Sequence, residues 1–150
     1  MNIALINATI FTGEETLENK SILIQDGLIF SITNQSEIPS DYQITDLRGL
    51  SIAPGLIDLQ IYGSGGKLFG ALPDEEGLEQ MEKDLLAQGT TGFFATAATN
   101  SDEVVTKAID AAKKYRKKAK GNFLGLHLEG PYLNAKRKGA HPENYIKKGN

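Results

Sequence analysis

The chain has 150 residues, of which 40% are hydrophobic and 23% charged, and its formal net charge is −3. This balance favours a folded globular protein, because a disordered tail carries fewer apolar residues and a dedicated nucleic-acid-binding protein is basic. Cysteine is absent, which excludes disulfides, thiolate metal sites and cysteine nucleophiles. No apolar run approaches the ~20 residues of a membrane-spanning helix, and no targeting signal is visible at the start. We therefore expect neither a nucleic acid nor a membrane as partner.

The first fifty residues predict a small antiparallel β unit. Asp26-Gly27 is a typical two-residue hairpin turn between two runs of β-branched and apolar residues. No residue in this part is typical of a catalytic group. The expected strands are 2–11, 21–25, 28–33 and a short one within 44–50.

After Pro54-Gly55 the pattern changes to strands that alternate with amphipathic helices. Such alternation implies a parallel sheet with right-handed crossovers, and nearly all-apolar strands imply that both faces of the sheet are covered. The expected elements are a strand 56–62, a helix that begins near Pro73 and ends at Gly89, a strand 90–97, a helix from Ser101 to Gly121 and a strand 123–129.

Helical spacing also predicts which side chains the two helices bury. The first helix is expected to bury one apolar stripe and the second a stripe of small and β-branched residues. These stripes are Leu78, Met81, Leu85 and Leu86 in the first helix, and Val105, Ala108, Ile109 and Ala112 in the second.

The strand spacing suits either a Rossmann-type sheet or the start of a (β/α)₈ barrel. A barrel takes ~250 residues, and only about 100 follow the β unit, so most of a barrel would be missing. Both folds bind ligands at the carboxyl ends of their strands, so the residues that carry chemistry are expected at those ends.

The first strand ends in the glycine-rich segment 60–66. It matches neither a phosphate-binding P-loop nor the dinucleotide fingerprint, because Leu68 stands where a further glycine or Ser/Thr is required. A turn in which backbone approaches backbone is the simpler interpretation of these glycines.

The third strand ends in His127-Leu128-Glu129, whose first and last side chains share a face. A carboxylate there needs a cation or hydrogen-bond donors, and a structural lysine or arginine would serve as well as a metal. His127 could equally be a core histidine with its hydrogen bonds satisfied. The basic triplet Lys136-Arg137-Lys138 is typical of a solvated face, yet Ala140 and His141 just after it could contact an anionic or polar substrate.

Two sets of residues carry a resemblance to a known family. Ala53-Pro54-Gly55-Leu56-Ile57-Asp58 resembles the start of the first barrel strand in the amidohydrolase superfamily. The segments 63–66, 127–132 and 138–141 together resemble N-acetylglucosamine-6-phosphate deacetylases. The resemblance implies an α/β fold: part of a small β-sandwich in residues 1–52, then the first three βα units of a (β/α)₈ metal-dependent hydrolase barrel in residues 53–150.

The resemblance also implies roles for individual residues. Glu129 matches the family's ligand to a catalytic divalent metal, and Ala140 and His141 match its substrate-contacting pair. Gln60 and Tyr62 stand where many amidohydrolases carry a His-x-His pair, so we expect one metal ion, zinc or another transition metal, rather than two. Gln60, Tyr62 and His127 are expected to line the site.

In the family, two histidines and a proton-shuttling aspartate come from later strands. No catalytic residue is therefore expected within these 150 residues, and the chain taken alone is expected to be inactive. The complete enzyme would hydrolyse the acetamide of N-acetylglucosamine 6-phosphate in cytoplasmic amino-sugar catabolism, as a homodimer. The alternatives are another amidohydrolase acting on amides, a non-catalytic truncated barrel module, and a small Rossmann-like nucleotide binder.

Overall fold

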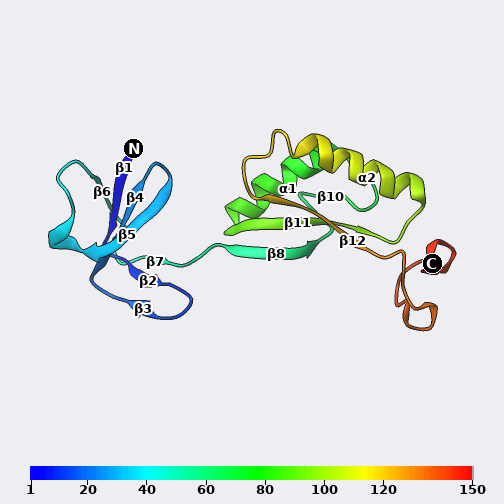
Figure 1. Ribbon diagram of the computed structural model, residues 1–150, viewed down its shortest axis with the longest axis horizontal. Coiled ribbons are helices and arrows are strands. Elements are labelled where there is room, and N and C mark those ends of the chain that lie inside the picture. Colours follow the sequence, from blue (N-terminus) through cyan, green and yellow to red (C-terminus); the bar gives the residue numbers. More distant parts are fainter. Residues whose placement is uncertain (150) are drawn as a thin grey trace. The chain divides into compact units, whose positions relative to one another are not determined.

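The computed structural model describes residues 1–149 and contains two compact units, Met1–Pro54 and a second unit that begins at Gly55. The first unit is built of strands, and the second combines strands with two α-helices (Figure 1). Across the described residues, no helix is both long and apolar enough to cross a membrane.

The first unit holds two small sheets. One has the strand order β5-β4-β1-β6 and the other the order β3-β2-β7. The hairpin predicted at Asp26-Gly27 is confirmed: β4 and β5 pair in antiparallel fashion, and both turn residues have positive φ, 51° and 81°. The strands are β1 (Asn2–Ile6), β2 (Thr9–Phe11), β3 (Thr16–Leu17), β4 (Lys20–Gln25), β5 (Leu28–Asn34), β6 (Gln43–Asp46) and β7 (Ser51–Ile52), with a 3₁₀ turn at Gln35–Glu37.

Two expectations for this unit are wrong. The single strand predicted over 2–11 is broken because Asn7 adopts a left-handed conformation (φ 55°), and its two halves enter different sheets. The unit is also not purely antiparallel, since β6 pairs with β1 and β7 with β2 in parallel. The last predicted strand stops at Asp46, whose carboxylate accepts a hydrogen bond from the Arg48 N–H at 2.8 Å and starts a turn.

The second unit contains a parallel three-stranded sheet in the order β12-β11-β8. Its two helices lie on the same side of this sheet (Figure 1). Each helix begins at a side-chain cap: Asp74 accepts from the Gly77 N–H at 2.6 Å and Ser101 from the Val104 N–H at 3.4 Å. The elements are β8 (Leu56–Ile61), β9 (Gly63–Ser64), β10 (Lys67–Leu68), α1 (Glu75–Ala87), β11 (Thr90–Ala98), α2 (Asp102–Tyr115) and β12 (Phe123–Glu129), followed by 3₁₀ turns at Ala135–Arg137 and Glu143–Tyr145.

The hydrophobic core of this unit lies between the sheet and the two helices, and it differs in part from the predicted stripes. Leu86 is 56% exposed rather than buried. The helix α2 ends at Tyr115, earlier than the predicted Gly121, because the backbone after it tightens into i→i+3 hydrogen bonds. Val105 and Ile109 are only half-buried. The core residues are Phe69, Leu78, Met81, Leu85, Phe93, Ala95, Ala97, Ala108, Ala111, Ala112, Tyr115 and Phe123.

The expected cover on both faces of the sheet is not present within the described chain. Both helices pack on one face, and Leu56, Ile57 and Leu59 of β8 remain largely exposed. The apolar sequence of 56–62 is typical of a strand covered on both faces, whereas residues 1–149 cover only one face of this sheet.

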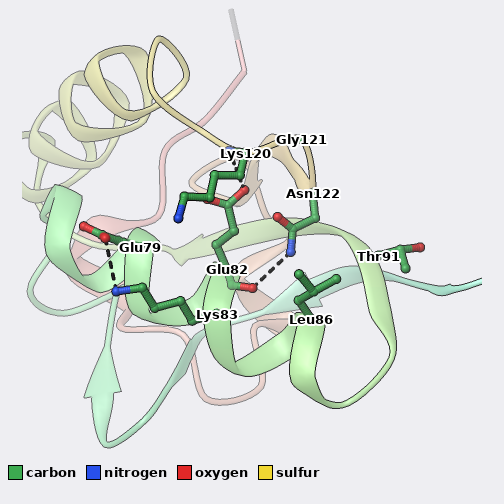
Figure 2. A pocket seen from close by; sticks show the side chains of 8 residues that line it. All are labelled: Glu79, Glu82, Lys83, Leu86, Thr91, Lys120, Gly121 and Asn122. Carbon is green, nitrogen blue, oxygen red and sulfur yellow. Dashed lines mark hydrogen bonds and ion pairs between the residues drawn. The ribbon is translucent and has the colours of Figure 1, made fainter. Parts of the chain in front are cut away.

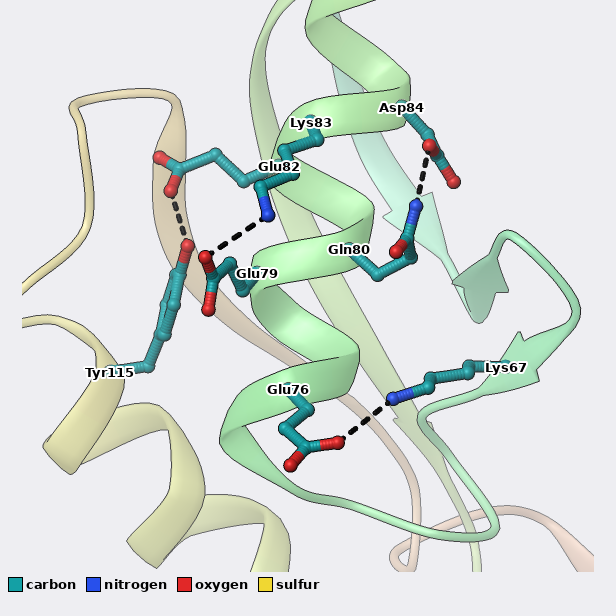
Figure 3. Close-up of polar contacts among 8 residues, drawn as sticks. All are labelled: Lys67, Glu76, Glu79, Gln80, Glu82, Lys83, Asp84 and Tyr115. Carbon is teal, nitrogen blue, oxygen red and sulfur yellow. Dashed lines mark hydrogen bonds and ion pairs between the residues drawn. The ribbon is translucent and has the colours of Figure 1, made fainter.

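A buried polar pair joins the two helices (Figure 3). The Tyr115 hydroxyl on α2 donates a hydrogen bond to the Glu82 carboxylate on α1. The other carboxylate oxygen accepts the Lys120 N–H at 2.9 Å, and the Glu82 backbone carbonyl accepts from the Asn122 side chain at 3.0 Å. This pairing explains why a glutamate can sit within the packed interface, since each carboxylate oxygen has a donor.

Replacing Tyr115 with phenylalanine is expected to lower the free energy of unfolding by about 1–3 kcal/mol, because one buried Glu82 oxygen loses its donor. Burial, and then the hydrogen bond to Glu82, raise the pKa of Tyr115 above its ordinary value of 10.0. The stabilisation is therefore present below about pH 10 and lost as the pH rises through the raised pKa. Urea unfolding at pH 7 and above pH 10 measures both effects, with Tyr132→Phe (67% exposed) as the control. Equal stability of Tyr115→Phe and wild type at pH 7 would contradict the assignment.

Candidate functional site

The carboxyl ends of β8, β11 and β12 surround a cavity of about 550 Å³. Register pairing sets Ala98 at the end of β11 beside Glu129 at the end of β12, and Ala95 beside Ile61 of β8. The loop that follows β12 closes the other side. The lining residues are Tyr62, Ala98, Glu129, Leu133, Arg137, Lys138, Gly139, Ala140, His141 and Pro142.

Glu129 is oriented by a hydrogen bond from Tyr62, the residue that follows β8. The Tyr62 hydroxyl donates to Glu129 Oε2, and Gln60 Nε2 donates to the Tyr62 oxygen at 2.8 Å. The bond from Tyr62 lowers the pKa of Glu129 below its ordinary value more than burial raises it, and the charges of His141 and His127 lower it further. The same bond raises the pKa of Tyr62. Glu129 is therefore held as a carboxylate, and the hydrogen bond from Tyr62 occupies Oε2 and not the second oxygen, Oε1.

His141 faces that second oxygen. Its Nε2 atom lies 3.6 Å from Glu129 Oε1, and its Nδ1 atom lies 2.9 Å from Thr99 Oγ1. The Lys138 ammonium donates to the His141 backbone carbonyl at 3.3 Å and stabilises the loop around it. Glu129 and His141 thus approach each other across the cavity from different segments.

Of the other predicted site residues, Ala140 lines the cavity, and Gln60 and His127 do not. Ala140 lines the cavity beside His141, whereas Gln60 reaches it only through Tyr62. His127 is not a lining residue: its Nδ1 atom lies 3.0 Å from the Leu59 backbone carbonyl, which can only accept, so Nδ1–H donates there. His127 therefore connects β12 with β8.

The glycine-rich segment after β8 forms the hairpin of β9 and β10. A side chain at Gly63 would lie 2.0 Å from the Lys67 carbonyl oxygen, so only glycine fits there. Ser64 donates to Asp84 on α1 at 2.7 Å. Gln80 donates to the other oxygen of that carboxylate at 2.7 Å (Figure 3). The hairpin is thereby attached to α1 next to Tyr62, and Gly63 permits close backbone packing within it.

Sequence reasoning missed Thr99, Arg137 and Lys138 as members of the site. Thr99 follows the last residue of β11, so the rule that ligands gather at strand ends could have indicated it. Arg137 and Lys138 belong to a basic triplet that is typical of a solvated face, and nothing in its local pattern shows that the loop folds back over the strand ends.

The donor atoms present suit one part of a metal site. Glu129 supplies an oxygen ligand, and His141 Nε2 is the nearest nitrogen. Within residues 1–149, however, no group of three or more His, Cys, Asp or Glu residues could hold a metal ion. A catalytic zinc ion takes three protein ligands, so this part of the chain cannot complete such a site alone.

A second hollow of about 330 Å³ lies at the opposite ends of the strands (Figure 2). Its polar groups pair with one another: Lys83 with Glu79 at 3.1 Å, and Asn122 with the Glu82 backbone carbonyl. None of the described residues that line it is a histidine. The cavity with Glu129 and His141 is therefore the stronger candidate for chemistry.

Comparisons with known proteins concern both units. The family model described as the NagA composite domain matches residues 3–52. N-acetylglucosamine-6-phosphate deacetylase of Haemophilus influenzae is 37% identical over 98% of this chain and 39% of its own length. N-acetylgalactosamine-6-phosphate deacetylase of a Shewanella species is 30% identical over 93% of the chain and 36% of its own length.

Solved structures agree with these sequence matches. The crystal structure of N-acetylglucosamine-6-phosphate deacetylase from Pasteurella multocida superposes with a TM-score of 0.91 at 35% identity, over 98% of this chain and 39% of that one. The enzyme of the same name from Thermotoga maritima superposes with a TM-score of 0.79 at 26% identity, over 99% of this chain and 38% of that one. The chain thus spans about 39% of the length of these relatives or less.

Proposed function

We propose that this chain, which corresponds to the N-terminal portion of the N-acetylglucosamine-6-phosphate deacetylases, supplies one side of the active site of such an enzyme. The full-length protein would hydrolyse the acetamide of N-acetylglucosamine 6-phosphate to glucosamine 6-phosphate and acetate. The observation that carries this proposal is the pair of Glu129 and His141, 3.6 Å apart in a cavity at the strand ends. The chain that contains this pair is similar to these deacetylases over nearly the whole of its 150 residues.

Glu129 is the proposed protein ligand to one divalent metal ion, zinc or another transition metal. When bound, the ion would polarise the acetamide carbonyl and lower the pKa of a water molecule. Tyr62 occupies Glu129 Oε2 and leaves Oε1 for such a ligand role. The amide of Gln60 and the phenol of Tyr62 are poor transition-metal ligands beside imidazole, which supports one ion rather than two.

The loop residues Ala140 and His141 are the proposed substrate contacts. Ala140 offers a small side chain and backbone groups, and His141 offers Nε2 toward the cavity. His127 and Gln60 do not line the cavity but stabilise residues around it. His127 donates to the Leu59 backbone carbonyl, and Gln60 donates to the Tyr62 hydroxyl oxygen. The remaining metal ligands and the aspartate that moves the proton to the leaving amine would come from outside these 150 residues.

The architecture proposed for the complete protein is a (β/α)₈ barrel beside a small β-sandwich. Residues 53–150 would form the first βα units of the barrel, and residues 1–52 would form part of the sandwich. The parallel order β12-β11-β8 and the exposed apolar side chains of β8 support the barrel, because the remaining strands and helices of a barrel would cover them. A cytoplasmic homodimer remains our proposal for the full-length enzyme.

The 4-epimer of the substrate is a second candidate, because a relative that is 30% identical carries the name N-acetylgalactosamine-6-phosphate deacetylase. Acetate release by the full-length protein should be measured with both sugar phosphates. We expect the higher kcat/KM with N-acetylglucosamine 6-phosphate. A higher value with the galactosamine epimer would reassign the substrate, and no acetate from either would refute the proposed function.

A further inference from the structure

Thr99 is a buried residue of the candidate site to which the mechanism above gives no role. It follows directly after β11 and is only 4% exposed. Its hydroxyl lies within hydrogen-bond distance of two groups: it donates to the Glu129 backbone carbonyl at 3.0 Å, and it lies 2.9 Å from His141 Nδ1. One hydroxyl therefore joins the residue that carries the carboxylate to the residue that carries the imidazole.

The surroundings of Thr99 leave its hydroxyl little freedom. A Cβ atom at Gly130 would lie 2.0 Å from Thr99 Oγ1, so the main chain after Glu129 passes directly over the hydroxyl. The φ angle of Gly130 is +98°, a conformation that few residues other than glycine adopt. The fold thus brings the backbone of the 129–130 segment against Thr99, and the hydroxyl occupies a fixed position.

This position decides which ring nitrogen of His141 faces the cavity. Because the single hydroxyl proton of Thr99 is donated to the Glu129 carbonyl, Thr99 Oγ1 accepts from His141 Nδ1–H, and Nε2 is the nitrogen that remains for a ligand. Nε2 is also the atom that lies 3.6 Å from Glu129 Oε1. Without a partner at Nδ1, the ring could rotate about its side-chain bonds and the separation between Nε2 and the carboxylate would no longer be set.

We propose that Thr99 is a positioning residue that holds the His141 ring with Nε2 toward Glu129 and the substrate. The expected effect of Thr99 on catalysis rests on the proposed function. Its effect on the orientation of the His141 ring does not. Thr99→Val keeps the shape of the side chain and removes the hydroxyl, whereas Thr99→Ser keeps the hydroxyl. Partners that orient the ligands and contacts of a metal site typically contribute about 10- to 100-fold to activity or metal affinity, and we expect a loss of that size in kcat/KM for Thr99→Val.

Thr96, which lies within β11 three residues before Thr99, offers a matched control. It is fully buried like Thr99, but its hydroxyl has no hydrogen-bond partner among the described residues. Thr96→Val is therefore the same chemical change at a buried threonine without the bridge. We expect it to leave kinetics and the His141 ring signals at their wild-type values.

The test is made in the full-length protein labelled with nitrogen-15 histidine, with the His141 signals assigned by their loss in His141→Gln. We expect Thr99→Val to change the ring-nitrogen shifts of His141, which report its tautomer, and to lower kcat/KM, with both restored in Thr99→Ser. Unchanged ring shifts in Thr99→Val, or equal losses in the serine and valine variants, would overturn the proposal. If wild-type protein releases no acetate, the proposed function fails, and the ring shifts still decide the role of Thr99.

Discussion

Full-length protein carrying Glu129→Gln is expected to lose about 10³-fold or more in kcat/KM for deacetylation, because a metal ion in such a site contributes several kcal/mol and each 1.36 kcal/mol is tenfold in rate. The amide has nearly the shape of the carboxylate, but it is neutral and a much poorer ligand. Bound metal, measured by elemental analysis after gel filtration, should fall together with activity. The carboxylate is positioned for this role by Tyr62, which binds its other oxygen.

Two variants separate a local effect from a general one. Glu143→Gln makes the same change at an exposed position of the loop after β12 and should leave activity and metal content unchanged. Tyr62→Phe removes only the hydrogen bond to Oε2 and should give a smaller loss than Glu129→Gln. Wild-type activity in Glu129→Gln would remove this residue from the proposed mechanism.

The second large effect concerns residues 1–150 expressed by themselves. They are expected to release no acetate from N-acetylglucosamine 6-phosphate and to bind no stoichiometric zinc with a dissociation constant below about 1 μM, because a catalytic zinc ion takes three protein ligands. Within residues 1–149 the structure contains no cluster of three or more candidate ligands. Zinc titration by calorimetry and an acetate assay measure both outcomes.

The full-length protein is the control for this experiment and should bind one metal ion per chain. Tight stoichiometric binding by the 150 residues alone would show that Glu129 and His141 complete a site with groups that we have not assigned. It would also make the downstream ligands of the proposed mechanism unnecessary.

Local sequence signals predicted most of the second unit. The capping residues Asp74 and Ser101 begin helices as expected, and the strand 123–129 has the predicted bounds. The errors occurred where tertiary contacts override local pattern. Leu86 has the spacing of a core residue yet lies in the open hollow of Figure 2, and the buried Glu82 is a charged residue whose donors come from the α2–β12 region.

The first unit was harder to predict, because parallel pairing depends on segments that are distant in sequence. Asn7 is the one weak turn signal in residues 2–11, because asparagine adopts the left-handed conformation more readily than most residues, but it does not tell that the two halves enter different sheets. The side-by-side order of β1 and β6 could not be inferred from either strand alone.

Part of the candidate site was accessible from the sequence. The shared face of His127 and Glu129 followed from strand geometry, and the roles of Glu129, Ala140 and His141 were implied by a family resemblance. The bridge through Thr99 was not accessible, because a threonine at a strand end has no distinctive pattern. Only the fold brings its hydroxyl between the Glu129 backbone and the His141 ring.

The most direct test of the central claim is to locate the metal ion in the full-length protein by anomalous diffraction at the zinc edge. One peak per chain is expected, at about 2.0–2.2 Å from a carboxylate oxygen of Glu129. A peak without Glu129 among its ligands, or two peaks in one active site, would contradict it.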